Sequence, residues 1–379
     1  MPMPYTATEQ KDKTIMSEPP KDTPEAPTVS QTDFERISTI VYAEFQVDEA
    51  LLEYGLPTYR LKEPQETKQA FLKVLGNLKP MHLIAILRRI DGKVVLKVVQ
   101  EPQVKPSNVL VNWALFFATI ATTFYTGYVI SLELVNREVM SDPFTGAAMF
   151  VVAIMAVLGT HEMGHKLTAN KNKMEATLPY FIPGLPPNMG GFGTFGAVIM
   201  QKSLPPNRDA LFDIGSSGPI VGFVLALVAS IVGLLISPIY PLTGTESGFL
   251  PVPIIFELFF VYMVRLPSGF YIMAHPVALA GWVGMIVTML NLLPAGQLDG
   301  GHVARSVLGR SSIVFTVLSF LYLIIIGAYP MAIFLLFISM YKHPGPLDDV
   351  SSLSTGRKIL TLGLVAIFVL CSFPLFPLF

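Results

Sequence analysis

Long apolar segments alternate with short polar ones through most of this chain, from about residue 109 onward. A helix needs about 20 mostly apolar residues to cross a bilayer, so each long segment is a candidate span. The fifth segment carries Gly327 and Pro330 near its middle, which predicts a break and a helical hairpin. The pattern therefore predicts an all-α polytopic membrane protein of about six to seven transmembrane segments. The candidate spans cover residues 109–131, 145–169, 211–236, 273–294, 313–341 and 358–379.

The first hundred residues follow a different pattern. Residues 1–32 are rich in Pro, Thr, Glu and Lys and contain few large apolar side chains, which predicts a disordered tail. Residues 33–104 predict a small soluble α+β domain, in which no catalytic constellation is visible. We expect a strand at 44–47, a helix over 65–78, and a hairpin whose strands at 82–88 and 94–99 flank Asp91-Gly92.

The composition supports a membrane protein. Hydrophobic residues make up 52% of the chain and charged residues only 14%, and the mean hydropathy is +0.55. A net charge of −1 gives no indication of a nucleic-acid partner. The single cysteine, Cys371, excludes an intrachain disulfide and a Cys-based zinc site, so any metal would rely on His and carboxylate ligands.

The distribution of basic residues predicts the orientation in the membrane. Several Lys and Arg residues lie between the second and third candidate spans, whereas the next loop carries only Arg265. By the positive-inside rule the former loop is cytoplasmic, and two crossings then place residues 33–104 in the cytoplasm too. Residues 343–379 are expected to form a cytoplasmic linker followed by a C-terminal transmembrane segment.

The candidate chemistry begins with the sequence His-Glu-Met-Gly-His at residues 161–165, near the end of the second span. Positions i and i+4 share one face of a helix, so His161 and His165 are placed to bind one zinc ion. Glu162 is placed to act as the general base on a zinc-activated water. Polar side chains at membrane depth cost roughly 2.5–3.5 kcal/mol each, which favours a functional explanation.

A catalytic zinc ion usually takes three protein ligands and keeps one position open. Asp299 is the only carboxylate in or beside the fourth span, and that span should run in the same direction as the second. The two histidines and Asp299 are therefore expected at a similar depth near the cytoplasmic side. Pro294 and the glycines after it predict a helix break there. His302 could support Asp299 or could equally be a surface residue.

Between the second and third spans, residues 192–200 form an apolar, glycine-rich segment that favours a short re-entrant strand or hairpin. An exposed strand edge could hold a substrate peptide extended through main-chain hydrogen bonds. The alternative is a membrane-surface loop with glycines at its turns. In the third span, Gly215, Gly218 and Gly222 suit close helix contact, and packing without chemistry is the expected role.

Together, the motif at 161–165, the segment Gly193-Thr194-Phe195-Gly196 with Ala197, and the motif from Asn291 to Gly300 resemble the site-2 protease family of intramembrane zinc metalloproteases. The resemblance covers roughly residues 110–342, and we expect the protease core at 109–342. The layout of this chain is similar to the branch of that family without a PDZ domain, found in archaea, cyanobacteria and chloroplasts. The resemblance implies one zinc ion on His161, His165 and Asp299, with Glu162 as base. It further implies that Asn291 and residues 193–196 bind the substrate.

Members of that family cut transmembrane segments of membrane-tethered regulators, usually after a first cut by another protease. The expected function is therefore a zinc-dependent intramembrane endopeptidase, with transmembrane proteins and the lipid bilayer as partners. A prokaryotic plasma membrane is expected, because residues 1–32 show neither a secretory signal nor a transit pattern.

Three other classes of protein are possible. A non-catalytic membrane scaffold would not need Glu162, and a transporter would be expected to show an internal repeat, which we do not see. A metalloprotease whose site faces a large enclosed chamber would be expected to use a glutamate as third ligand, and the fourth span offers Asp299 instead.

Overall fold

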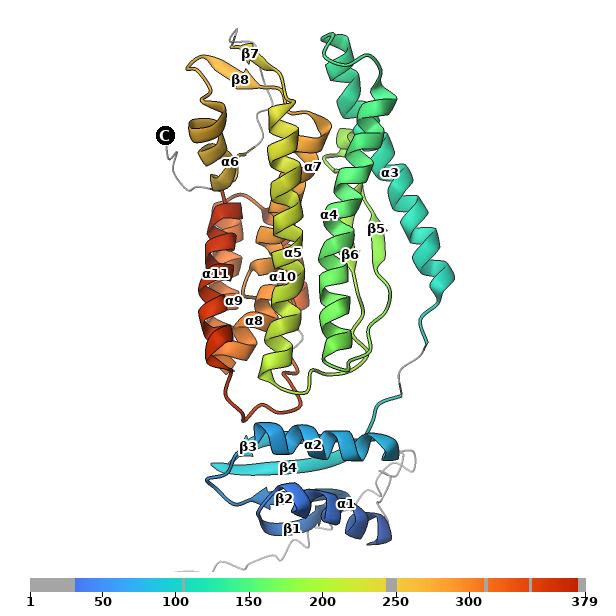
Figure 1. The fold of residues 1–379 in the computed structure, drawn as a ribbon, viewed down its shortest axis with the longest axis vertical. Coiled ribbons are helices and arrows are strands. Elements are labelled where there is room, and N and C mark those ends of the chain that lie inside the picture. Colours follow the sequence, from blue (N-terminus) through green and yellow to red (C-terminus); the bar gives the residue numbers. More distant parts are fainter. Residues whose placement is uncertain (1–30, 104–105, 243–250, 310–312, 341–342, 374–379) are drawn as a thin grey trace, which may run out of the picture.

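The computed structural model describes residues 31–103, 106–242, 251–309, 313–340 and 343–373. The described chain is mostly helical, with a small sheet domain at its N-terminal end. Figure 1 shows a tall bundle of helices and, beneath one end of it, the N-terminal domain in blue. Helix α2 lies on the side of this domain that faces the bundle.

The N-terminal domain is a four-stranded antiparallel sheet in the order β1-β2-β4-β3, with two helices packed on it. Alternate residues of the strands point toward the helices, so Tyr59, Leu87 and Leu96 are fully buried against Phe71 and Val74 of α2. The elements are α1 (Gln31–Glu44), β1 (Val47–Glu53), β2 (Leu56–Leu61), α2 (Lys68–Leu78), a short 3-10 turn (Lys79–Met81), β3 (Leu83–Ile90) and β4 (Lys93–Gln100).

The sequence prediction for this region is confirmed for its main elements. The predicted hairpin is β3 and β4, joined at Asp91-Gly92, where both residues have positive φ as a tight turn requires. The predicted helix over 65–78 begins slightly later, at Lys68. The strand predicted at 44–47 is wrong in position, because Glu44 ends α1 and β1 begins at Val47. The predicted tail largely lies outside the described residues.

Among the described residues, three helices are long and apolar enough to cross a membrane: α3, α4 and α5. The other apolar helices are shorter, so the predicted number of spans stays a prediction. The bounds are α3 (Val109–Asn136), α4 (Pro143–Lys171), α5 (Arg208–Leu235), α6 (Ile254–Leu258) continued by a π-helix (Phe259–Val264), α7 (Pro276–Leu292), α8 (Asp299–Leu308), α9 (Ile313–Ile325), α10 (Tyr329–Ser339) and α11 (Thr355–Cys371).

Two small hairpins accompany the helices. Strands β5 (Tyr180–Pro183) and β6 (Thr194–Val198) pair antiparallel beside α3, and β7 (Ile239–Pro241) pairs with β8 (Phe270–Ile272) at the far end of the bundle. A short 3-10 turn at Pro187–Met189 lies between β5 and β6. The predicted strand within residues 192–200 is therefore present as β6, and its depth in a bilayer stays a prediction. The predicted break in 313–341 is also present, between α9 and α10.

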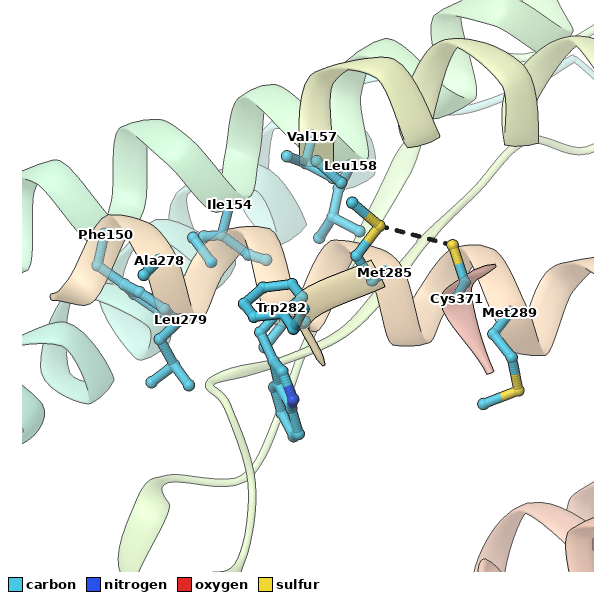
Figure 2. Packing of buried hydrophobic residues seen from close by; sticks show 14 of the residues in the cluster. Phe150, Ile154, Val157, Leu158, Ala278, Leu279, Trp282, Met285, Met289 and Cys371 are labelled. Carbon is cyan, nitrogen blue, oxygen red and sulfur yellow. Dashed lines mark hydrogen bonds between the residues drawn. The ribbon is translucent and has the colours of Figure 1, made fainter. Parts of the chain in front are cut away.

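Helix α7 lies at the centre of the apolar core, in contact with α4, α5 and α11. Figure 2 shows Phe150 and Ile154 of α4 beside Leu279 and Trp282 of α7. The indole of Trp282 donates a hydrogen bond to the carbonyl of Pro251 at 2.9 Å, so its one polar atom is satisfied. This core fixes α4 and α7 relative to each other, and both helices lead into the candidate site.

Phe71→Ala is expected to destabilise the N-terminal domain by about 3–5 kcal/mol, because it leaves a cavity where the ring is fully buried. Hydrogen exchange of the β3 and β4 amides in the full chain measures this loss. Tyr54→Asn is the control, since Tyr54 is 94% exposed and Asn tolerates its positive φ. Equal exchange in the two variants would contradict the assigned core.

Candidate metal centre

The two histidines of the site lie one turn apart near the C-terminal end of α4. The helix begins at Pro143, and the carboxylate of Asp142 just before it accepts a hydrogen bond from the backbone N–H of Thr145 at 2.9 Å and caps the first turn. His161 and His165 are 3% and 5% exposed, and Glu162 between them is 6% exposed. These are polar groups in an apolar bundle, so each needs a partner there.

Asp299 reaches the histidines because the chain breaks between α7 and α8. Helix α7 ends at Leu292, Pro294 follows, and α8 begins at Asp299 itself. Its carboxylate Oδ2 lies 3.2 Å from Nε2 of His161 and 3.2 Å from Nε2 of His165. The two Nε2 atoms are 3.1 Å apart. The structure thus brings together the three residues that the sequence predicted as ligands.

The three ligand atoms fit a tetrahedral metal ion. Zinc bonds to nitrogen and oxygen of about 2.0–2.1 Å place neighbouring ligand atoms about 3.3 Å apart. The observed separations of 3.1–3.2 Å are close to that value. Two imidazoles and one carboxylate also leave a fourth position free, which is the donor set of catalytic zinc sites. His161, His165 and Asp299 could therefore hold one metal ion.

A carbonyl of α5 orients one of the histidines. Nδ1 of His165 donates a hydrogen bond of 2.8 Å to the backbone oxygen of Ile214. This bond places the ring proton on Nδ1 and leaves Nε2 unprotonated toward Asp299, which is the tautomer that binds a metal through Nε2.

Three glycines of α5 make room for the site. A Cβ on Gly218 would overlap the ring of His165, and one on Gly222 would lie 2.8 Å from Nδ1 of His161. A Cβ on Gly215 would lie 2.7 Å from the backbone oxygen of Asp299. The sequence prediction treated these glycines as sites of helix contact. The structure gives these glycines a more specific role, because each of them lies against a candidate ligand.

Glu162 faces the hairpin on the other side of α4. The backbone N–H of Ile199, directly after β6, points toward its carboxylate. The turn of the hairpin is held to α3, because the hydroxyl of Thr122 donates a 2.6 Å hydrogen bond to the carbonyl of Gly193. The backbone at Gly193 has φ +77° and a Cβ there would lie 2.6 Å from the Thr122 carbonyl, so only glycine fits.

Of the predicted substrate-binding residues, Asn291 lies beside a metal ligand, whereas residues 193–196 lie in the hairpin of β5 and β6. Nδ2 of Asn291, at the end of α7, lies 3.2 Å from Nε2 of His161. Thr194, Phe195 and Gly196 belong to β6, with the Phe195 side chain 67% exposed. His302 is not a free surface residue: its Nδ1 shares a 2.6 Å hydrogen bond with Nε2 of His343. No sequence pattern indicated this second histidine.

A match to a known protein family covers the three candidate ligands, Glu162 and the predicted substrate-binding residues, but not His343. Peptidase family M50 matches residues 149–329. Residues 149–329 of the chain are therefore similar to an M50 peptidase domain. This agrees with the resemblance to site-2 proteases drawn from the motifs.

Three similar proteins of plants are each named as a probable chloroplastic zinc metalloprotease. The probable zinc metalloprotease EGY1, chloroplastic, of Oryza sativa subsp. japonica is 31% identical over 247 residues, covering 62% of this chain and 42% of the relative. The Arabidopsis thaliana protein of that name is 31% identical, covering 60% and 43%. The probable zinc metalloprotease EGY2, chloroplastic, of Arabidopsis thaliana is 27% identical, covering 62% and 42%.

The chain thus spans less than half the length of these relatives. No solved structure matches it significantly. The relatives are chloroplastic by name, so they give no support to the predicted prokaryotic plasma membrane.

Gly218→Ala is expected to reduce bound zinc strongly, because the added methyl group overlaps the ring of His165 and displaces it from Asp299. Elemental analysis of the detergent-purified full chain measures the zinc content. Val224→Ala is the matched control on the same helix, since that side chain is 54% exposed. Wild-type zinc content in the Gly218 variant would show that the close approach of α5 does not fix the position of His165.

Proposed function

We propose that this protein is a zinc-dependent intramembrane endopeptidase, which hydrolyses peptide bonds within or near the transmembrane segments of membrane-tethered proteins. The observation that carries the proposal is the convergence of His161, His165 and Asp299 beside the buried carboxylate of Glu162. The M50 match over residues 149–329 and the names of the relatives support the same activity.

The donor set determines what a bound metal would contribute. When bound by His161, His165 and Asp299, zinc lowers the pKa of a water molecule toward about 7 and polarises a carbonyl group. Glu162 accepts the proton of the attacking water and passes it to the nitrogen of the departing amine. His165 keeps its position through this proton transfer, because Ile214 holds its Nδ1.

The hairpin offers a way to hold the substrate. A peptide in a helix has its amides occupied, so it must be extended before hydrolysis. Strand β6 pairs with β5 on one edge, and its other edge is proposed to receive the substrate as an added strand. Ile199, at the end of this strand, lies against Glu162, so a peptide bound along residues 193–196 would run toward the metal ligands. Asn291 is proposed to donate a hydrogen bond to its backbone.

The orientation proposed for the protein places the site and the N-terminal domain on the cytoplasmic side. In Figure 1 the domain lies under the end of the bundle where α4 ends and α5 begins. This is the end that carries the basic loop between the second and third predicted spans.

Glu162→Gln is expected to retain zinc and to lose cleavage, because the amide cannot accept the proton of the attacking water. Asp299→Ala is the matched variant and is expected to lose both zinc and cleavage. Zinc content and cleavage of a reconstituted transmembrane substrate are measured for both. Normal turnover by the Glu162 variant would overturn the protease proposal and favour a non-catalytic membrane scaffold.

Asn291→Ala is expected to retain zinc and to lower kcat/KM by about tenfold, through loss of one hydrogen bond worth about 1.4 kcal/mol to the substrate backbone. The same cleavage assay and zinc analysis separate binding of the substrate from binding of the metal. Loss of both zinc and activity would instead show that Asn291 holds His161 in position and does not act mainly on the substrate.

A further inference from the structure

The segment of residues 343–351, which we call the anchor segment, joins the N-terminal domain to the helical bundle. The backbone N–H of Leu87 in β3 donates to the carbonyl of Leu347 at 2.9 Å, and the N–H of Asp349 donates back to the carbonyl of Leu87 at 3.2 Å. The side chain of Leu347 is 4% exposed and belongs to the apolar core of the N-terminal domain. The anchor segment therefore pairs with the β3 edge of the sheet through one isolated β-bridge.

The same segment is bound to the loop that leads into α5. The N–H groups of Leu347 and Asp348 donate to the carbonyls of Pro205 and Pro206 at 2.8 and 2.9 Å. The carboxylate of Asp348 is fully buried and accepts hydrogen bonds from the backbone of Val350 and Ser351, which fixes the shape of the segment. One short stretch of chain thus holds the sheet on one side and the start of α5 on the other.

Two further contacts reach α8, the helix that begins with Asp299. Arg305, 6% exposed, donates two hydrogen bonds to the carboxylate of Asp349, at 3.1 and 2.7 Å. Burial alone would raise the pKa of Asp349, but the hydrogen bonds and positive charges of Arg305 and Arg208 hold it below its usual value. A paired carboxylate and guanidinium in this geometry form a rigid link.

The second contact lies one turn from the candidate metal ligand. His302 follows Asp299 by three residues on α8, and it shares a 2.6 Å hydrogen bond with His343 at the start of the anchor segment. Gly345 lies close against the guanidinium of Arg305, with a positive φ of +72°. Residues on both sides of Gly345 therefore hold α8.

We propose that the anchor segment is a positioning element for Asp299, through which docking of the N-terminal domain sets the affinity of the metal centre. Helix α8 has only 10 residues, too few to be stable alone, so its contacts with other segments set where Asp299 lies. Helix α5 packs against it, with Gly215 beside the backbone of Asp299, and Arg305 and His302 join it to the anchor segment. Because the anchor segment also pairs with β3 and buries Leu347 in the core of the N-terminal domain, undocking that domain loosens the same contacts.

The inference rests on the proposed metal centre, and it requires a reciprocal effect. If docking raises the affinity for zinc, then zinc must stabilise docking by the same factor. Bound zinc is therefore expected to slow hydrogen exchange at the Leu87 amide, which donates to the anchor segment. The Arg60 amide, on the far side of β4, provides an internal comparison.

The test measures zinc affinity of the full chain in detergent by competition with chelators. Asp349→Asn is expected to lower the affinity by about tenfold, the lower end of the loss when a group that orients a ligand is removed. Leu347→Ala, which leaves α8 untouched and weakens docking, is expected to lower it by a smaller factor. Arg60→Ala is the control, because it removes an exposed ion pair with Glu49 at the opposite edge of the sheet.

Cobalt(II) in place of zinc adds a spectroscopic signature, since its visible absorption depends on the arrangement of the ligands. Asp349→Asn is expected to change this spectrum and Arg60→Ala to leave it unchanged. A wild-type affinity and spectrum in Asp349→Asn would overturn the inference and leave the metal centre in place. If Leu347→Ala releases the N-terminal domain and leaves the zinc affinity unchanged, the proposed role of docking is overturned. If the wild-type chain binds no zinc, the metal centre fails, and the inference fails with it.

Discussion

The arrangement around the site depends on one constraint, which is the cost of placing polar ligand atoms inside an apolar helical bundle. Each such group must find a partner, because an unpaired polar group in apolar surroundings costs several kcal/mol. His165 finds Ile214, and the three ligand atoms face one another at 3.1–3.2 Å. The glycines of α5 and the break after α7 serve the same requirement, since they let two helices approach close enough for these atoms to meet.

Local patterns predicted which three residues lie together at the candidate metal centre. The spacing of His161 and His165 fixes their common face on any helix, and Asp299 was the only carboxylate near the end of the fourth candidate span. The hairpin at Asp91-Gly92 and the break near Gly327 were likewise predicted from turn residues alone. These features depend on a few neighbouring residues, which explains why the sequence is sufficient for them.

Contacts between distant segments could not be predicted in this way. Gly218 was expected to pack against another helix, but which side chain it meets depends on how α4 and α5 cross. The pairing of Arg305 with Asp349 joins two charged residues with no sequence signal that links them. The bond between His302 and His343 bridges α8 and the anchor segment in the same way. Helix α1 was not predicted, although Ile37 and Val41, four residues apart, are buried on one face of it.

The anchor segment has a consequence for how the protein is divided into parts. The M50 match ends at residue 329, and it contains every candidate ligand together with Arg305. The carboxylate that neutralises Arg305 lies beyond it, at Asp349. A fragment cut at the limits of sequence similarity would keep the ligands and leave a buried guanidinium without its counter-charge. The segment that is similar to the M50 family and the segment that contains every partner of the buried charges therefore have different boundaries.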